Sequence, residues 1–515
     1  MWIRLPRITP LVRVTAIALL LVGGRAQSQR APSSLDASRR ALALIDSALE
    51  RHGGAQRLRS LDDVTLRSHG QRWMEWQSTS LRRPWVTQPT FTETILDFRR
   101  DRVAVRRINR YPLDFAFVGN QVITPQGNLL WDSTRAGLGD GIRRLNGFPA
   151  AQNAARRDLP ALQILQARNR AETVRWLGER VVGGTRQQGV SYAESNGAVY
   201  ELWFDSGTKH LASVEWMRDH PVDGDQLAVY EYSRYRVEKG IPVPGRLVER
   251  SNGEIVRDDT LTIAIDSHPA DALFQLPLSG FADPAPPVPP QGPESEAVRQ
   301  LADNVWLLQQ LPGGNRVMFV AFRDYVLVLE APTPQSVATA VLDAVRRTVP
   351  GKPVRYVAFS HHHDDHAGGL RPYIAEGITI VTTPAARPFV EHVASARHTL
   401  RPDELSSAPR APVIETFSTK RVFTDGDMVV ELHDIGPTSH VDEIVLAWLP
   451  RQKIVFQGDL LILPFRGEPG PANTLTVEFL RAVERLGLDA QTIAGVHGPV
   501  GTIDDLRKSV ARRTR

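Results

Sequence analysis

The chain has 515 residues, of which 42% are hydrophobic and 23% are charged, and its formal net charge is +5 at pH 7. This length allows two or three domains, and the ordinary balance of apolar and charged residues excludes extensive disorder. The 62 basic residues are interspersed with 57 acidic ones, so we expect no continuous basic surface and no nucleic-acid partner.

The first 26 residues have the layout of a secretory signal peptide. Three arginines and no acid stand in MWIRLPRITPLVR, and the short apolar run VTAIALLLVGG follows. Gly24 and Ala26 are small residues suited to cleavage after residue 26. The apolar run is shorter than the roughly 20 residues that span a bilayer, although a retained anchor is the alternative. We therefore expect a bacterial periplasmic or secreted protein.

Residues 31–278 have the pattern of a β-rich domain that begins with a helix. Apolar residues recur at helical spacing in ASRRALALIDSALERHGG, residues 37–54, and two glycines end that stretch. Alternating patterns follow, with a hairpin expected around Asp205–Lys209. A helix followed by a large antiparallel sheet resembles the half-barrel of periplasmic lipoprotein carriers. The resemblance implies a lipid or envelope partner for this half of the chain.

A proline-rich segment, residues 279–296, separates the two halves. It contains six prolines between Pro284 and Pro293, which favour an extended, semi-rigid spacer. In residues 297–515 the strand patterns alternate with helical ones, such as the helix expected after Thr333 as its N-cap. This alternation predicts an α/β fold with stacked sheets flanked by helices.

The chemistry is concentrated in AFSHHHDDHAGG, residues 358–369, which follows an apolar strand pattern. Side chains two residues apart in an extended stretch point the same way, so His361 and His363 can hold one ion together. Asp365 and His366 follow in the next turn and face a neighbouring position. The chain has no cysteine, so any metal must be held by His, Asp or Glu. Three further candidates, His440, Asp459 and His497, each follow a strand pattern downstream.

This order of residues, HxHxDH and then His, Asp and His, resembles that of the metallo-β-lactamase-fold hydrolases. The resemblance implies an αββα sandwich over about residues 300–512. It also implies two zinc ions, one held by His361, His363 and His440, the other by Asp365, His366 and His497, with Asp459 bridging. Asp365 would in addition orient the attacking water and act as the catalytic proton acceptor.

The expected reaction is attack of a metal-bound hydroxide on an ester, thioester, lactone or amide (β-lactam-like) bond of a small-molecule substrate. Related iron enzymes usually have Glu at the position of His363, which favours zinc, although a His/Asp set also admits iron or manganese. Two alternatives stay open: an iron-dependent oxygenase on the same fold, and a periplasmic protein that binds a lipid or lipoprotein.

The neighbouring polar residues receive lesser roles. His362 and Asp364 are expected to point away from the metals, and His392, His398 and His433 to be ordinary residues. Asp442 could accept a hydrogen bond from a ligand histidine. Glu330 could either support the metal loop or cap the following helix. The loops at 394–412 and 461–473, the latter with Arg466, are expected to shape the pocket, and the substrate-binding residues are unknown.

Overall fold

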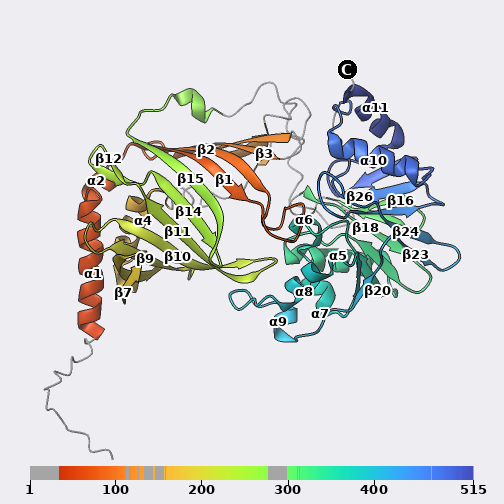
Figure 1. The fold of residues 1–515 in the computed structure, drawn as a ribbon, viewed down its shortest axis with the longest axis horizontal. Coiled ribbons are helices and arrows are strands. Elements are labelled where there is room, and N and C mark those ends of the chain that lie inside the picture. Colours follow the sequence, from red (N-terminus) through yellow and green to blue (C-terminus); the bar gives the residue numbers. More distant parts are fainter. Residues whose placement is uncertain are drawn as a thin grey trace, which may run out of the picture.

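The computed structural model describes residues 34–111, 115–125, 127–132, 143–144, 156, 158–275, 298–309, 311, 314–464 and 467–513. The expected signal segment 1–26, the expected spacer 279–296 and Arg466 lie outside these residues. Figure 1 shows two bodies side by side, a large curved sheet and a compact α/β domain. None of the described helices is long and apolar enough to cross a membrane.

The N-terminal region is built around a 13-stranded antiparallel sheet, with the order β6-β5-β4-β3-β2-β1-β15-β14-β11-β10-β9-β8-β7. The expected helix and the expected hairpin are both present. The described elements are α1 (Ser34–Arg51), α2 (Ala55–Arg59), β1 (Asp63–Trp73), β2 (Thr87–Asp97), β3 (Arg102–Tyr111), β4 (Phe115–Thr124), β5 (Gly127–Asp132), β6 (Arg143–Arg144), α4 (Pro160–Asn169), η2 (Ala171–Thr173), β7 (Arg175–Val182), β8 (Thr185–Ala193), β9 (Val199–Asp205), β10 (Leu211–His220), β11 (Gly224–Ser233), β12 (Arg236–Glu238), β13 (Ile241–Val243), β14 (Arg246–Ser251), β15 (Glu254–Ile265) and η3 (Asp271–Phe274).

Helices α1 and α4 pack on this sheet, and their apolar side chains form a core with those of the strands. Leu44 and Ile45 of α1 and Ile164 of α4 share a core with the inward residues of the strands, such as Leu202 and Val214. Alternation along the strands explains this, because every second side chain points to the same face. Two cavities of about 470 and 440 Å³ in this region are lined largely by charged and polar side chains. The expected lipid partner therefore gains no support.

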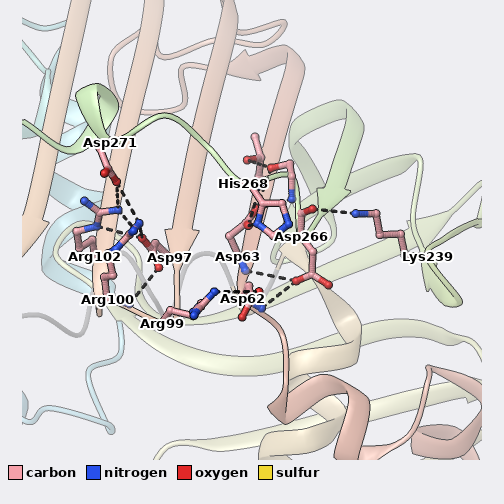
Figure 2. Close-up of polar contacts among 12 residues, drawn as sticks. Asp62, Asp63, Asp97, Arg99, Arg100, Arg102, Lys239, Asp266, His268 and Asp271 are labelled. Atoms are coloured by element: carbon pink, nitrogen blue, oxygen red, sulfur yellow. Dashed lines mark hydrogen bonds and ion pairs between the residues drawn. The ribbon is translucent and has the colours of Figure 1, made fainter.

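A polar network ties the end of this region to its sheet (Figure 2). Asp63 of β1 accepts hydrogen bonds from the backbone N–H groups of Ser267 and His268, at 2.8 and 3.0 Å. Arg102 of β3 donates to Asp97 at 2.5 Å and to Asp271 of η3 at 2.9 Å. Buried carboxylates are tolerated here because each accepts several hydrogen bonds. The segment that follows β15 is thereby held against β1 and β3.

The C-terminal domain stacks two mixed sheets between helices, in the order helix, sheet, sheet, helix. The first sheet runs β16-β17-β18-β19-β20-β21-β22 and the second β23-β24-β25-β26-β27-β28. The expected αββα sandwich is confirmed. Its elements are β16 (Val298–Ala302), β17 (Val305–Leu308), β18 (Val317–Ala321), β19 (Val326–Leu329), α5 (Gln335–Thr348), β20 (Val354–Ala358), α6 (Asp364–Ala367), α7 (Arg371–Ala375), β21 (Thr379–Thr382), α8 (Arg387–Ser395), α9 (Glu404–Ser407), β22 (Ile414–Thr416), β23 (Lys420–Thr424), β24 (Val429–Asp434), β25 (Val445–Leu449), β26 (Ile454–Gln457), α10 (Thr474–Arg485), β27 (Thr492–Gly495), β28 (Gly501–Thr502) and α11 (Ile503–Arg513).

Three apolar layers hold the sandwich together. One core lies between the sheets and includes Met318 and Phe456. A second joins the first sheet to α5, α7 and α8, and a third joins the second sheet to α10 and α11. Central strands such as β18 and β25 are buried on both faces, which explains their unbroken apolar sequences. One detail of the prediction was wrong: the N-cap of α5 is Pro334, not Thr333, and no side chain caps it.

The two bodies touch through two hairpin connections of the N-terminal region. The loop between β1 and β2, residues 74–86, contacts α6 and α8 of the C-terminal domain (Figure 1). The β10–β11 turn contacts α5 and α8. Val222 of the turn is completely buried in the core beneath α5 and α8, and Trp76 and Leu81 of the loop pack against that core. The N-terminal region therefore shares a core with the C-terminal domain.

Candidate metal centre

The histidine cluster lies where the first sheet ends. His361, His362 and His363 follow the parallel strand β20, and His363 is the N-cap of α6. Strand β20 pairs in parallel with β19 and β21, so the ends of these strands meet at one edge of the sheet. The backbone N–H of His366 donates to the carbonyl oxygen of His363 at 3.0 Å, which turns Asp365 and His366 back towards the same edge.

The second sheet supplies the other three predicted residues. His440 lies in the connection between β24 and β25, Asp459 follows β26, and His497 follows β27. Strands β26 and β27 are parallel, so their ends also meet at one edge. All seven residues predicted as ligands therefore converge across the join between the two sheets.

Their side chains form two groups whose ligand atoms lie within 4.8 Å of one another, namely His361, His363, His440 and Asp459 in one, and Asp365, His366 and His497 in the other. Asp459 stands between the groups. Its Oδ2 is 3.0 Å from Nε2 of His440, and its Oδ1 is 3.3 Å from Nε2 of His497 and 3.4 Å from Nε2 of His366. One carboxylate oxygen thus faces each group, an arrangement that suits a bridging ligand.

Three buried polar atoms of these residues lack a hydrogen-bond partner, which fits the binding of a cation. His363 Nδ1, His366 Nε2 and Asp459 Oδ1 are buried and make no hydrogen bond. Leaving a buried polar atom unpaired costs about 1–3 kcal/mol. Because three such atoms lie close together here, a bound cation that contacts them would remove this cost. Imidazole nitrogens and carboxylate oxygens together suit zinc, iron or manganese.

The electrostatics of the site agree with a cation-binding role. Burial, followed by the neighbouring histidines, holds the pKa of His361 well below its ordinary value, so its ring is neutral. Burial also acts to lower the pKa of His366, but Asp365, Asp459 and Glu330 outweigh it and raise that pKa well above its ordinary value. The three carboxylates thus create a strongly negative potential at His366, and a metal ion is one cation that such a potential attracts.

Glu330 and Ser360 orient the histidines from behind. Glu330 follows β19 and is buried, with its Oε1 accepting the backbone N–H of Ser360 at 3.0 Å and its Oε2 lying 3.2 Å from Nδ1 of His366. Ser360 Oγ lies 2.9 Å from Nδ1 of His361. Of the two roles considered for Glu330, contact with the metal loop is the one observed. Such contacts leave Nε2 of both rings for the centre.

Sequence reasoning missed Gln77 and Ser78 of the β1–β2 loop. Gln77 Nε2 donates to Oδ1 of Asp364 at 2.5 Å and to Oδ1 of Asp365 at 2.7 Å. The carbonyl oxygen of Ser78 lies 2.9 Å from Nε2 of His362 and 3.0 Å from Nε2 of His363. No sequence signal pointed to them, because a single Gln-Ser pair almost 300 residues away carries no metal-site pattern.

The lesser candidates have specific contacts instead. His392 and His398, expected to be ordinary, pair with Asp223 at 2.7 Å and Asp219 at 2.8 Å across the two bodies. His433 pairs with Glu431 within β24 at 2.9 Å. The backbone N–H of Asp442 donates to the carbonyl oxygen of Thr79. The segment 394–412 carries contacts to the N-terminal region, and its role in shaping a pocket stays a prediction, as does that of 461–473.

The fold and the convergent His/Asp set define an α/β metal-binding protein. Residues 312–497 match the family model described as the metallo-beta-lactamase superfamily, so this part of the chain is a metallo-β-lactamase superfamily domain. That superfamily consists mostly of metal-dependent hydrolases and implies a small-molecule substrate.

Solved structures also match part of the chain. A metallo-beta-lactamase from Pontibacter korlensis is 20% identical, with a TM-score of 0.33, over 42% of this chain and 98% of that one. The metallo-beta-lactamase FIM-1 from Pseudomonas aeruginosa, in its mono-zinc form, is 18% identical, with a TM-score of 0.32, over 42% and 94%. The DIM-1 metallo-beta-lactamase is 17% identical, with a TM-score of 0.32, over 42% and 96%.

Proposed function

We propose that the protein is a dinuclear zinc hydrolase that cleaves an ester, thioester, lactone or amide bond in a small molecule. The observation that carries this proposal is the position of Asp459, whose two carboxylate oxygens face two separate groups of histidines. A mononuclear site has no need of a carboxylate that faces both ways. His361, His363 and His440 would hold one ion, and Asp365, His366 and His497 the other.

Two zinc ions, when bound, would activate a water molecule and polarise the carbonyl group of the substrate. The protein's own side chains determine how the substrate approaches and which group accepts the proton of the water. The side chains of His361 and His366 are fully buried, whereas that of Asp365 is 34% exposed and that of His497 is 23% exposed. Substrate therefore approaches on the side of Asp365. We infer that Asp365 orients the water and accepts its proton, because it combines this exposure with an ionised carboxylate: burial alone would raise its pKa, but His366 and His497 outweigh burial and hold that pKa below its ordinary value.

We also propose that the protein acts in a bacterial periplasm or outside the cell. This proposal is supported by the arginine-rich and apolar pattern of residues 1–26 and by the absence of cysteine.

Metal content and hydrolysis, measured together, test the function. Wild type, Asp459→Asn and the matched control Asp489→Asn, an exposed residue that pairs with Lys453, are purified with zinc and counted by mass spectrometry. We expect about two zinc ions per chain in wild type and in the control. In Asp459→Asn we expect loss of at least one ion and a fall in ester, lactone or lactam hydrolysis of about 100-fold or more.

Other outcomes contradict the proposal in distinct ways. Bound iron together with oxygen consumption would assign the site to oxygen chemistry. An empty wild-type centre under zinc-replete conditions would reject the catalytic role. Full activity in Asp459→Asn would reject the bridging assignment.

A further inference from the structure

We propose that the β1–β2 loop of the N-terminal region, residues 74–86, positions ligand residues of the metal centre. In this view Gln77 and the carbonyl group of Ser78 are positioning groups that set the orientation of Asp365 and His363. The C-terminal domain carries all seven ligand residues, but their arrangement is complete only with the loop in place. This inference rests on the proposed function and extends it to a second part of the chain.

The carbonyl oxygen of Ser78 selects one form of His363. A carbonyl oxygen only accepts, so the nitrogen 3.0 Å away, Nε2, must carry the ring proton. The neutral ring then has its lone pair on Nδ1. Nδ1 of His363 is a buried atom that makes no hydrogen bond, and His363 belongs to the first ligand group. Fixing the proton on the outer nitrogen is the usual way in which a ligand histidine is oriented towards its metal.

Gln77 orients the carboxylate of Asp365. Its amide nitrogen has two N–H groups, one directed to Asp364 and one to Oδ1 of Asp365. The other oxygen of Asp365, Oδ2, remains 3.3 Å from Nε2 of His497 and 3.7 Å from Nε2 of His366. Gln77 therefore holds one oxygen of Asp365 away from the centre and leaves the other facing it. An uncharged donor suits this place, because it bonds two adjacent carboxylates without neutralising the negative potential that attracts a cation.

The loop is held firmly enough to orient these groups. Ser78 is buried, and its Oγ accepts the backbone N–H of Val86 at 2.7 Å, while the backbone N–H of Met74 donates to the carbonyl oxygen of Val86 at 2.9 Å and joins the two ends of the loop. The backbone N–H of Asp364 donates to the carbonyl oxygen of Trp76 at 3.2 Å, and that of Asp442 donates to Thr79 at 2.9 Å. The contacts thus reach both the first histidine loop and the connection that carries His440.

Trp76 anchors the loop to α8. Its ring lies 5.6 Å from the ring of Phe389 and 4.9 Å from that of His392, and its Nε1 donates to Asp223 at 3.0 Å. Asp223, in the β10–β11 turn, also lies 2.7 Å from Nε2 of His392. Both connections of the N-terminal region therefore meet at one interface beside the metal loop. A preorganised support of this kind raises metal affinity and catalysis without touching the ion.

Two variants of the full chain test the inference. Gln77→Met removes the donor while keeping the length of the side chain. The matched control is Gln335→Met, because Gln335 Nε2 also donates across the interface, to the carbonyl oxygen of Pro221 at 3.1 Å, but makes no contact with a predicted ligand side chain. The second variant replaces residues 74–86 by Asn-Gly. Trp73 and Thr87 are register partners, so a two-residue turn can join them and preserve the β1–β2 pairing.

Three measurements read the centre itself: zinc affinity by competition with a chelator, the visible spectrum of the cobalt-substituted protein, and kcat and KM. We expect Gln77→Met to weaken zinc binding or lower kcat by about 10- to 100-fold and to alter the cobalt spectrum, with KM little changed. The Asn-Gly variant should show a larger loss of zinc affinity or of kcat than Gln77→Met, because it also removes the Ser78 carbonyl. Gln335→Met should match wild type in its spectrum and zinc affinity.

The outcomes separate this inference from the proposed function. If wild type binds two zinc ions and hydrolyses substrate, but Gln77→Met and the Asn-Gly variant match the Gln335→Met control, the loop is only a domain contact and this inference is wrong. If wild type binds no metal at all, the proposed function fails and this inference fails with it.

Discussion

Arg371 shows how one side chain holds the segment on which the interface depends. It is 2% exposed, and it donates to both oxygens of Asp403, at 2.5 and 2.9 Å. It also donates to the carbonyl oxygens of Val393 and Ala396, at 2.9 and 3.0 Å. A buried guanidinium is tolerable only when its donors are paired in this way. Arg371 thereby fixes residues 393–403, the segment that contacts the end of β10 and the start of β11.

Because of Asp403, the stability of the domain should fall at acid pH. Burial alone would raise its pKa, but hydrogen bonds from Arg371 and Ser406 outweigh burial and hold the pKa below its ordinary value. Its contribution is therefore complete above the unfolded pKa of about 3.9 and is lost as pH falls towards the lower, folded pKa. We expect Asp403→Asn to lower the free energy of unfolding by about 2 kcal/mol at pH 7, less than for a fully buried pair.

Urea unfolding of wild type and Asp403→Asn at pH 7 and pH 3 measures this difference. The gap between the two proteins should narrow at pH 3. A gap that is the same at both pH values would contradict the assignment of the carboxylate as ionised and paired.

At the scale of elements, α10 begins with a cap that can be tested. The side chain of Asn473 accepts the backbone N–H of Thr476 at 2.8 Å, which pairs one of the free donors at the helix start. The helix packs Leu475 and Phe479 against the second sheet, whose strands β26 and β27 lead to Asp459 and His497. The cap therefore supports a helix that covers the sheet behind two predicted ligands.

Asn473→Ala should destabilise the protein by about 1 kcal/mol, because the donor loses its partner, whereas Asn473→Ser should cost only a few tenths. Thermal unfolding of both variants measures the effect. Equal loss in the two variants would show that the residue acts through packing rather than as a cap.

The elements differ in how well their patterns predicted them. The first helix was clear because its apolar residues repeat at helical spacing, and α1 matches it within a few residues. The start of α5 was wrong because Thr333 is a favourable cap residue by type, yet the chain enters the helix at Pro334. A cap depends on backbone angles that a residue type alone does not determine.

At the scale of the whole molecule, Gly224 is a point where the backbones of the two bodies approach each other closely. Its φ is +71°, and a Cβ atom there would lie 2.1 Å from the carbonyl oxygen of Arg397. The next residue, Asp225, accepts the backbone N–H groups of Thr399 and Leu400 at 2.9–3.0 Å. A side chain at position 224 must therefore displace this contact.

Gly224→Ala should loosen the docking of the N-terminal region on the C-terminal domain. Gly197→Ala is the matched control, because Gly197 also has a positive φ, +85°, but faces open space. Both variants bear the same backbone strain, roughly 1–2 kcal/mol, so their difference isolates the contact. We expect Gly224→Ala alone to show a larger radius of gyration by small-angle X-ray scattering and faster proteolysis between the two bodies. Equal behaviour of the two variants would contradict a docked arrangement.

The sequence by itself determined the α/β sandwich and the seven candidate ligands, which the fold brings together. These signals are local: apolar runs mark buried strands, and His361 to His366 lie within six residues. Only the tertiary structure decided that Gln77 and Ser78 border the centre, that Glu330 faces His366, and that His392 and His398 join two bodies. These contacts link residues far apart in the chain through single polar atoms, and no periodicity records such a pairing, because it depends on how two finished surfaces meet.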